Sequence, residues 1–192
     1  MTTQTSQING IDIQAIRNKA AAARTAEDAA TTFAVQTDWD GGFQSTSRST
    51  QWGYGEYVMP RDAQLTLNTP KEMGGSATTP TPLEAYLAAL NACLVVGLVI
   101  QCSIRGIEIR SLNVKTSGTV DARSFLAGDT TIAPGYPKLT CDFQVDADAD
   151  QAVLREAFDT ALNTSPNRAN VTGPVPLEID YRITSTVEQQ QV

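Results

Sequence analysis

The sequence predicts an α+β fold, an antiparallel sheet with helices on one face. Three observations lead to this prediction. Apolar residues alternate with polar ones in several separate stretches, a long apolar stretch of helical character lies mid-chain, and an amphipathic helical pattern precedes the last alternating stretch. The chain has 192 residues, of which 41% are hydrophobic, so it can bury one core and needs no second domain.

The first third of the chain predicts a helix followed by strands. Asp12 stands where an N-cap residue would begin an alanine-rich helix over residues 12–30. Residues 33–39 alternate apolar and polar side chains and run into the Asp-Gly-Gly turn at 40–42, which is typical of a strand entering a hairpin. A second extended region covers about residues 44–68, and a loop follows it.

A long apolar helix is expected in the middle of the chain. Thr81 as N-cap, Pro82 at the first helical position and Glu84 at the third form a capping box, and Gly106 closes the helix. The apolar run at 87–100 has 14 residues, fewer than the roughly 20 of a membrane span. Because it is apolar on all sides, we expect it to be buried at the centre of the domain.

The second half of the chain predicts two more strands, a helix and a closing strand. Strands are expected over residues 107–120 and 138–147, with an irregular excursion at 124–137 between them. Apolar residues at three-and-four spacing indicate an amphipathic helix over residues 150–163. Residues 176–184 alternate as a last strand.

The chain is interpreted as one cytoplasmic domain with short tails. Residues 1–30 form an N-terminal tail with a peripheral helix, residues 31–187 the domain and residues 188–192 a C-terminal tail. The net charge is −7 and no long run of Lys or Arg interrupts the acidic surface, which excludes nucleic acid as a partner. The start of the chain is polar and lacks the apolar block of a signal peptide, so a cytoplasmic location is expected.

The cysteines and the missing histidines limit the chemistry. Cys93, Cys102 and Cys141 form no C-x-x-C pair, which argues against a disulfide framework or a zinc site. Histidine is absent, and this removes the Ser-His-Asp triad, the Cys-His protease pair and nearly every metal site built on imidazole. We therefore expect free thiols, no metal and no cofactor.

A series of short motifs occurs in a specific order from about residue 9 to residue 183. The motifs are INGIDIQAIR, TPKEMGG, TPLEAYLAALNACL, IRGIEI, FLAGD, APGY and SPNRANVTGPVPLEI. In this order they make the chain resemble the OsmC/Ohr superfamily, the osmotically inducible protein C and organic hydroperoxide resistance proteins. The resemblance implies an OsmC-like fold, with antiparallel sheets wrapped around long central helices in an intertwined homodimer. It also implies a thiol peroxidase that acts on organic hydroperoxides and hydrogen peroxide in the oxidative stress response.

The resemblance carries residue roles over to this chain. Cys93 matches the peroxidatic cysteine, whose thiolate attacks the O–O bond. The position of the resolving cysteine is Ser165, and a hydroxyl cannot resolve a sulfenic acid. The chain therefore looks like a single-cysteine member that needs an external dithiol as reductant. The family's glutamate lies ten residues before the cysteine, which is Leu83 here, and Glu84 is its neighbour.

The family's arginine comes from an early strand or from the loop before the central helix. At the expected place this sequence has Gln44 or Trp52, with Arg48 and Arg61 nearby. The candidate catalytic set that the resemblance implies is Cys93, Glu84 and Arg61.

The same residues also have structural interpretations. Cys93 fits an apolar helix as an inert small residue, Glu84 fits the capping box and Ser165 fits a helix N-cap. Asn91 is interpreted first as an interface residue, and otherwise as the partner of a neighbouring backbone group or of a ligand. Cys102 lies nine residues from Cys93, about 13.5 Å along the helix and beyond disulfide reach.

An alternative function belongs to a different class. The chain would be a non-catalytic OsmC-like dimer that binds a small apolar ligand around Leu90, Cys93 and Val96. Cys141 is expected to face the core from its strand. The expected partners are a second copy of the chain, a small hydroperoxide or an apolar ligand, and an external dithiol, with no nucleic acid and no membrane.

Overall fold

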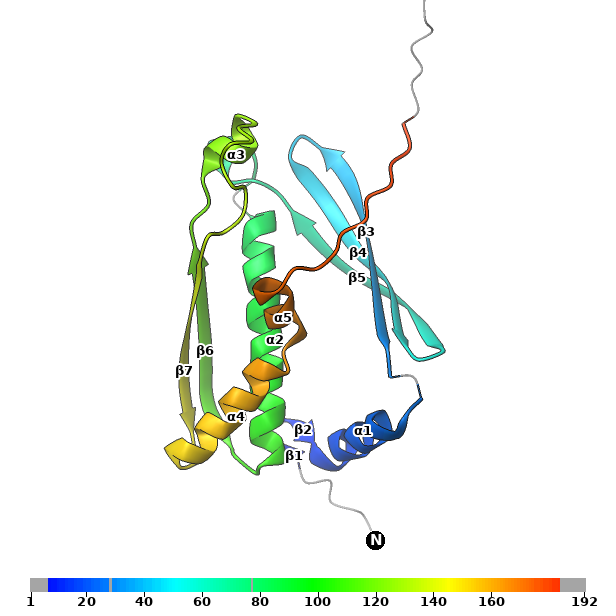
Figure 1. The fold of residues 1–192 in the computed structure, drawn as a ribbon, viewed down its shortest axis with the longest axis vertical. Coiled ribbons are helices and arrows are strands. Elements are labelled where there is room, and N and C mark those ends of the chain that lie inside the picture. Colours follow the sequence, from blue (N-terminus) through cyan, green and yellow to red (C-terminus); the bar gives the residue numbers. More distant parts are fainter. Residues whose placement is uncertain (1–6, 28, 77, 184–192) are drawn as a thin grey trace, which may run out of the picture.

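The computed structural model describes residues 7–27, 29–76 and 78–183 (Figure 1). In chain order its elements are β1 (Gln7–Ile8), β2 (Ile11–Asp12), α1 (Ile13–Thr25), β3 (Thr31–Gly41), β4 (Gln44–Tyr54), β5 (Tyr57–Leu67), the 3-10 turn η1 (Lys71–Met73), α2 (Pro82–Ile104), β6 (Ile109–Gly118), α3 (Ala122–Leu126), β7 (Leu139–Ala147), α4 (Gln151–Asn163) and α5 (Pro166–Thr172). The strands of this part of the chain pair antiparallel as β1-β2, β3-β4-β5 and β6-β7. This arrangement confirms the α+β class. The C-terminal tail at 188–192 lies outside the described residues.

The N-terminal hairpin β1-β2 is tied to the far end of α2 by Asn9. This residue has a positive φ of 53°, as the turn between the two short strands requires. Its side-chain amide donates to Ser103 Oγ and to the Ile107 carbonyl, both at 2.9 Å. Its Oδ1 accepts the Ile109 N–H at 2.8 Å. One side chain thus fixes the start of the chain against the junction of α2 and β6.

α1 is the predicted alanine-rich helix. Asp12 caps it by accepting the Ala15 N–H at 3.0 Å, as expected. The helix ends at Thr25 rather than at residue 30, because Ala26 adopts extended backbone. Ile13 is its one buried residue, so the helix is peripheral.

β3, β4 and β5 form a sheet with one apolar and one polar face. The extended region expected at 44–68 is two strands, because the chain turns at Gly55, where φ is 54°. Strand register places on one face Phe33, Val35, Trp39, Trp52 and Leu65, which we call the open face. Phe33 is 73% exposed and Trp39 is 77% exposed.

The other face of this sheet is polar. Arg48 and Asp38 form an ion pair across β3 and β4 at 2.8 Å. The alternation predicted for residues 33–39 is therefore present, but its apolar side chains are exposed within one chain.

α2 begins and ends where the sequence predicts. Thr81 Oγ1 accepts the Glu84 N–H at 3.1 Å, and the Glu84 carboxylate accepts the Thr81 N–H at 2.8 Å. These two bonds satisfy backbone donors that the first helical turn leaves free. At the other end the helix stops at Ile104, and Gly106 takes the left-handed conformation with φ 75°.

The core lies between α2, α4 and the β6-β7 hairpin. Its buried cluster consists of Leu98, Cys102, Ile107, Ala157 and Ala161. Phe143 of β7 and Phe158 of α4 pack against it edge to face, with ring centroids 4.8 Å apart. α4 approaches α2 closely at Gly97, where an added Cβ would lie 3.5 Å from Ala161. The amphipathic helix expected at 150–163 is thus the second wall of the core.

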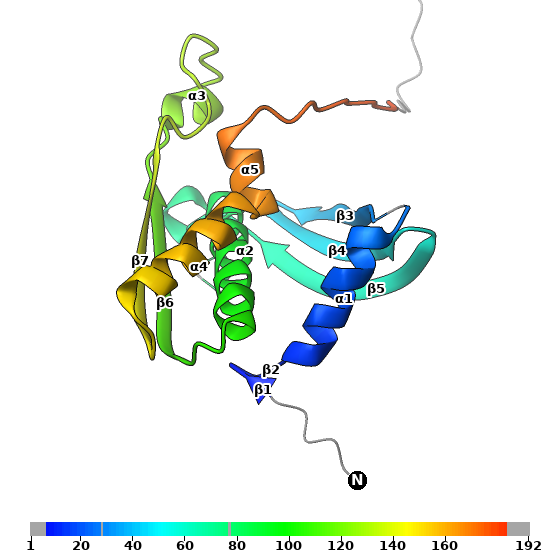
Figure 2. The same ribbon diagram turned by 60° about the horizontal axis from the view of Figure 1, so that its bottom comes forward.

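Only one side of α2 is covered within the chain, which corrects the expectation of a helix buried all round. In both views β6-β7 lies on one side of α2 and the β3-β4-β5 sheet on the other (Figures 1 and 2). Leu90, Leu94 and Leu98 are buried, whereas Val96 is 58% exposed. By length and composition α2 is the one described helix that could cross a membrane, but the core helix of a globular domain passes the same test.

The closing strand expected at 176–184 is absent from the described part, residues 176–183. The chain leaves α5 and runs away from the body without pairing (Figure 1). Leu177 and Ile183 are 81% and 82% exposed. The alternation is present in the sequence, but a strand needs a neighbouring edge that offers hydrogen bonds, and this chain does not bring one there.

Candidate functional site

Cys93 lies in the middle of α2, on a side of the helix that faces α5. It is half-buried and does not belong to the buried core cluster. Its Sγ is 3.3 Å from the Oγ of Ser165, within the range of a sulfur hydrogen bond. The structure therefore brings together the two positions that the resemblance assigns to the attacking and the resolving cysteine.

Ser165 is held rigidly beside that sulfur. Only 5% of it is exposed, and it caps α5 by accepting the Arg168 N–H at 3.3 Å, which confirms the predicted N-cap role. Asn167 anchors the same turn to α2, because its side-chain amide donates to the Ala89 carbonyl at 3.0 Å. When the sulfur is a thiolate it has no hydrogen, so the Ser165 hydroxyl must be the donor in their contact.

Arg168 brings a cation to the first turn of α5. Its guanidinium donates to the Leu162 carbonyl at 3.3 Å, at the end of α4. Neither Asn167 nor Arg168 belongs to the predicted catalytic set. Both residues follow directly after a predicted N-cap and a proline. This position in the sequence was the signal that could have identified them, because side chains in the first turn of a helix can face the preceding element.

The other two cysteines cannot reach Cys93 within the chain. Cys102 is fully buried in the core, and this burial raises the pKa of its thiol against the smaller opposing effect of Arg105. Cys141 lies on the expected α2-facing side of the hairpin, because it pairs with Thr116, whose hydroxyl bonds to Asn91, but it is exposed rather than buried. It lies at the uncovered end of β7, and its sulfur is 3.1 Å from the Thr116 hydroxyl on β6.

Asn91 bonds within the chain, as the second interpretation, a neighbouring backbone partner, expects. Its Oδ1 accepts the Thr116 hydroxyl at 2.5 Å, and its amide donates to the Val114 carbonyl at 3.4 Å. The two residues between Asn91 and Cys93 turn the helix by about 200°. Asn91 therefore marks the β6 side of α2, and Cys93 points to the opposite side, away from Cys141.

Glu84 is engaged in the capping box. The Thr81 backbone N–H, which donates to the carboxylate, and then the Thr81 side chain hold the pKa of Glu84 below its ordinary value. Nine helical residues, about 13.5 Å of rise, separate it from Cys93. The structure does not bring these two predicted residues together.

Arg61 lies on β5, in the sheet on the other side of α2 (Figure 1). Among the described residues no hydrogen bond or ion pair joins it to α2. Arg48, the other arginine considered, is paired with Asp38. Arg61 is thus the arginine of this sheet that takes part in none of the ion pairs found among the described residues.

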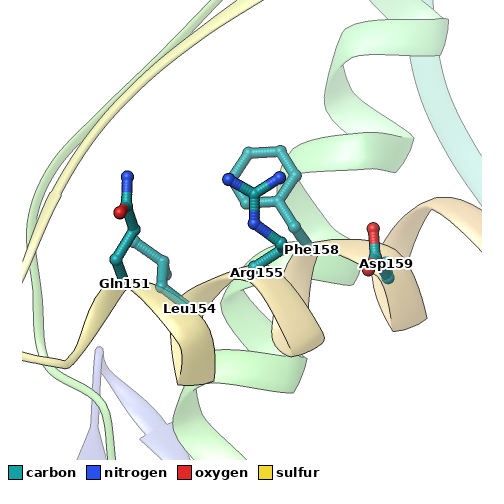
Figure 3. A pocket seen from close by; sticks show the side chains of 5 residues that line it. All are labelled: Gln151, Leu154, Arg155, Phe158 and Asp159. Atoms are coloured by element: carbon teal, nitrogen blue, oxygen red, sulfur yellow. The ribbon is translucent and has the colours of Figure 1, made fainter.

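Two hollows in the surface do not include Cys93 in their lining. One of about 280 Å³ is lined entirely by residues of α4, namely Gln151, Leu154, Arg155, Phe158 and Asp159 (Figure 3). It contains no cysteine and is formed by a single helix, so it is not a candidate for thiol chemistry. A larger hollow lies beside the first turns of α2 and includes Tyr86 and Tyr136, which the sequence did not single out.

Comparisons with known proteins found a matching family model and similar folds. A family model described as OsmC-like protein matches residues 74–180, more than half of the chain. Similar solved structures include an OsmC-like protein from Mycoplasma pneumoniae, with 17% identity, a TM-score of 0.57, and coverage of 74% of this chain and 88% of that one. An OsmC-like protein of unknown function from Vibrio cholerae has 10% identity, a TM-score of 0.51, and coverage of 73% and 94%.

A third similar structure is an organic hydroperoxide resistance protein OsmC from Legionella pneumophila. It shares 14% identity at a TM-score of 0.45, with coverage of 74% of this chain and 90% of that one. Among curated proteins none matches the chain.

Proposed function

Because the chain belongs to the OsmC-like family, we propose that it is a thiol-dependent peroxidase that reduces organic hydroperoxides through the single cysteine Cys93. The observation that carries the proposal is the contact of Cys93 Sγ with the Ser165 hydroxyl at 3.3 Å. A hydroxyl at this distance can donate a hydrogen bond to the sulfur when Cys93 is a thiolate, which is the nucleophilic form of cysteine.

The chemical step is a two-electron transfer. The Cys93 thiolate attacks the terminal oxygen of ROOH, and an S–O bond forms as the O–O bond breaks. The alkoxide leaves and takes a proton from water to give the alcohol. Sulfur is oxidised to the sulfenic acid, and the hydroperoxide is reduced to ROH.

Regeneration requires a thiol from outside the chain. Ser165 cannot form a disulfide, Cys102 is buried in the core, and Cys141 lies on the far side of α2. An external dithiol would displace water from the sulfenic acid to form a mixed disulfide. Its second thiol would then displace Cys93 and restore the reduced protein.

A homodimer is part of the proposal. The open face of the β3-β4-β5 sheet and the uncovered side of α2 leave more apolar surface exposed than a stable monomer usually carries. The segment at 176–183 is unpaired within the chain, and it alternates as a strand would. A second copy that covered these surfaces would also provide the arginine, and Arg61 is our candidate for it.

The test is the intact mass of the reduced protein after brief exposure to one equivalent of tert-butyl hydroperoxide, with the sulfenic-acid trap dimedone present. We expect one trap adduct on wild type and on Cys141→Ser, the control that removes the exposed thiol. Cys93→Ser should give none. Unmodified wild type, or an adduct that persists in Cys93→Ser, would end the proposal.

A Ser165→Cys variant sharpens the test. Its new sulfur would lie beside Cys93 at nearly the distance of the present contact, so a disulfide needs only a small movement. We expect the peroxide to produce an internal disulfide, with two hydrogens lost and no trap adduct. A trap adduct that forms as readily as in wild type would show that residue 165 does not face the oxidised sulfur.

The alternative is a non-catalytic dimer that binds a small apolar ligand. The observation that favours it concerns the other two predicted catalytic residues: Glu84 is engaged in the capping box, and Arg61 lies on β5 with no hydrogen bond or ion pair to α2 among the described residues. Apolar ligands should then raise the melting temperature of wild type and of Cys93→Ser alike. An unreactive Cys93 together with such a shift would favour this function.

A further inference from the structure

A hollow of about 480 Å³ lies where three separate segments of the chain meet. The first turns of α2 contribute Leu83 and Tyr86, the segment 135–139 leads into β7, and the last turn of α5 contributes Val171 and Thr172. Its volume is within the range of sites for small ligands, about 300–1,000 Å³. Because its walls come from distant parts of the sequence, the hollow is a feature of the folded chain rather than of one element.

The lining combines aromatic rings, aliphatic side chains and one cation. The rings of Tyr86 and Tyr136 are stacked, with centroids 6.3 Å apart and 16° between their planes. Tyr86 is 46% exposed, so part of its ring is accessible. Lys138 is the one charged residue in the lining, and it takes part in none of the ion pairs found among the described residues. No carboxylate lines this hollow.

We propose that this hollow binds a small planar aromatic anion, with its ring against the tyrosines and its anionic group at the Lys138 ammonium. The aromatic ring of the ligand gains binding free energy from stacking and from its removal from water, and neither contribution requires a charge. The anionic group selects the ligand, because a lysine without a carboxylate partner favours an anion in an otherwise acidic protein. A cationic or purely aliphatic ligand uses one of these features at most.

The proposed site is distinct from Cys93. Tyr86 precedes Cys93 by seven residues, which is about 10.5 Å along α2. Between them the hydrogen bond from Asn167 to the Ala89 carbonyl closes α5 onto α2. Cys93 is not among the lining residues. Binding at this hollow therefore does not depend on the peroxidase proposal, and Cys93→Ser should bind as wild type does.

The experiment is a titration of the isotope-labelled, reduced full chain with 2-naphthoate, followed by amide chemical shifts. We expect a Kd on the order of 10⁻⁴ M, typical of a compact ligand of this size. The shifts should centre on residues 83–86, 135–139 and 171–172. Uncharged 2-naphthamide has the same rings and should bind about fivefold to tenfold more weakly at low salt, a difference that high salt should reduce.

Two variants and a matched control test the residues. Lys138→Gln should weaken 2-naphthoate about fivefold to tenfold and leave 2-naphthamide unchanged. Lys115→Gln, on the exposed lysine of β6 opposite Asp142, should change neither. Leu83→Trp should fill the hollow and abolish binding of both, and because Leu83 is 40% exposed this variant should fold.

Three outcomes would overturn the proposal. The first is 2-naphthoate that causes no shifts at millimolar concentration. The second is a set of shifts centred on the open face or on Cys93. The third is equal affinity for acid and amide in wild type, which would remove Lys138 from the site. A failure of peroxide to oxidise Cys93 bears on none of these results.

Discussion

The β6-β7 hairpin and the β3-β4-β5 sheet are both antiparallel and regularly paired, yet only the hairpin has its apolar face covered within the chain. Phe143 and Val145 of β7 pack against the buried cluster, whereas Phe33 and Trp39 of β3 are mostly exposed. Strand pairing satisfies the backbone in both regions. The difference shows that hydrogen-bonded order does not by itself bury apolar surface, which is the larger favourable contribution to stability.

The contrast also separates the apolar surface that one chain buries from the apolar surface that it leaves exposed. α2, α4 and β6-β7 form a core in which small residues such as Ala157 and Ala161 are fully enclosed. The sheet and the far side of α2 meet no comparable neighbour. Substitutions in the packed core should therefore change the free energy of unfolding of a single chain. Substitutions on the open face should change the strength of self-association.

The largest effect is expected in the packed half. Leu98→Ala removes a side chain that is 1% exposed and should lower the free energy of unfolding by about 2–5 kcal/mol, because the close-packed helices cannot fill the cavity. Urea unfolding at several protein concentrations measures it, and the loss should not depend on concentration. Val96→Ala on the open side of the same helix is the control. An equal, concentration-independent loss for Val96→Ala would contradict the distinction between the two sides.

The next effect is expected on the open face. Phe33→Ser should weaken self-association roughly a hundredfold, because each of two copies loses about 1.5 kcal/mol of apolar burial. Sedimentation equilibrium measures the dimer Kd directly. Gln36→Ser, on the polar face of the same strand, should leave it unchanged. A Phe33→Ser protein that associates like wild type would show that the open face is not the interface.

A smaller effect of opposite sign is expected where α2 meets α4. Gly97→Ala should stabilise the chain by about 0.5–1 kcal/mol, because alanine favours the helix and its Cβ would make an ordinary 3.5 Å contact with Ala161. Thermal unfolding checks the sign. Gly97→Val, whose γ carbons would press into the backbone of α4, should destabilise it. Destabilisation by alanine as well would mean that the helices cannot shift by even a few tenths of an ångström.

The smallest effect concerns the capping box at the start of α2, where the sheet side of the chain joins the packed half. The pKa of Glu84 is lowered in the folded chain, so the cap contributes fully above the ordinary pKa of about 4.3 and is lost as pH falls through the lower folded value. Glu84→Gln keeps the bond to Thr81 and should remove this part of the acid dependence. Melting temperatures between pH 6 and pH 3 measure it.

The same variant separates the two interpretations of Glu84. If the carboxylate only caps, Glu84→Gln should turn over hydroperoxide at pH 7 as fast as wild type. A large loss of turnover with an unchanged melting temperature would instead assign Glu84 a catalytic role.

The starts of α1, α2 and α5 and the end of α2 were predictable because their signals are local. Asp12, Thr81 and Ser165 each cap the helix that follows them, and Gly106 ends α2. A cap needs only the next three or four residues, so a short stretch of sequence contains all of its information.

The errors concern which distant segments lie opposite each other. The alternation at 176–184 is that of a strand, but no edge in the chain receives the described part of it. The bonds of Asn91 to β6 could not be obtained from the sequence, because its partners are more than twenty residues away. The proximity of Cys93 and Ser165, 72 residues apart, was implied by the family resemblance and could not be obtained from spacing.

The side chain of Asn9 has a consequence for the order of events during synthesis. Its bonds to Ser103, Ile107 and Ile109 join residues up to 100 positions apart. A ribosome adds about 5–20 residues per second, so the first hairpin waits roughly 5–20 s before its docking site exists. The three strands with the open face are made during that interval. The nascent chain therefore presents its largest exposed apolar surface first, and early binding by a chaperone would protect that surface from aggregation.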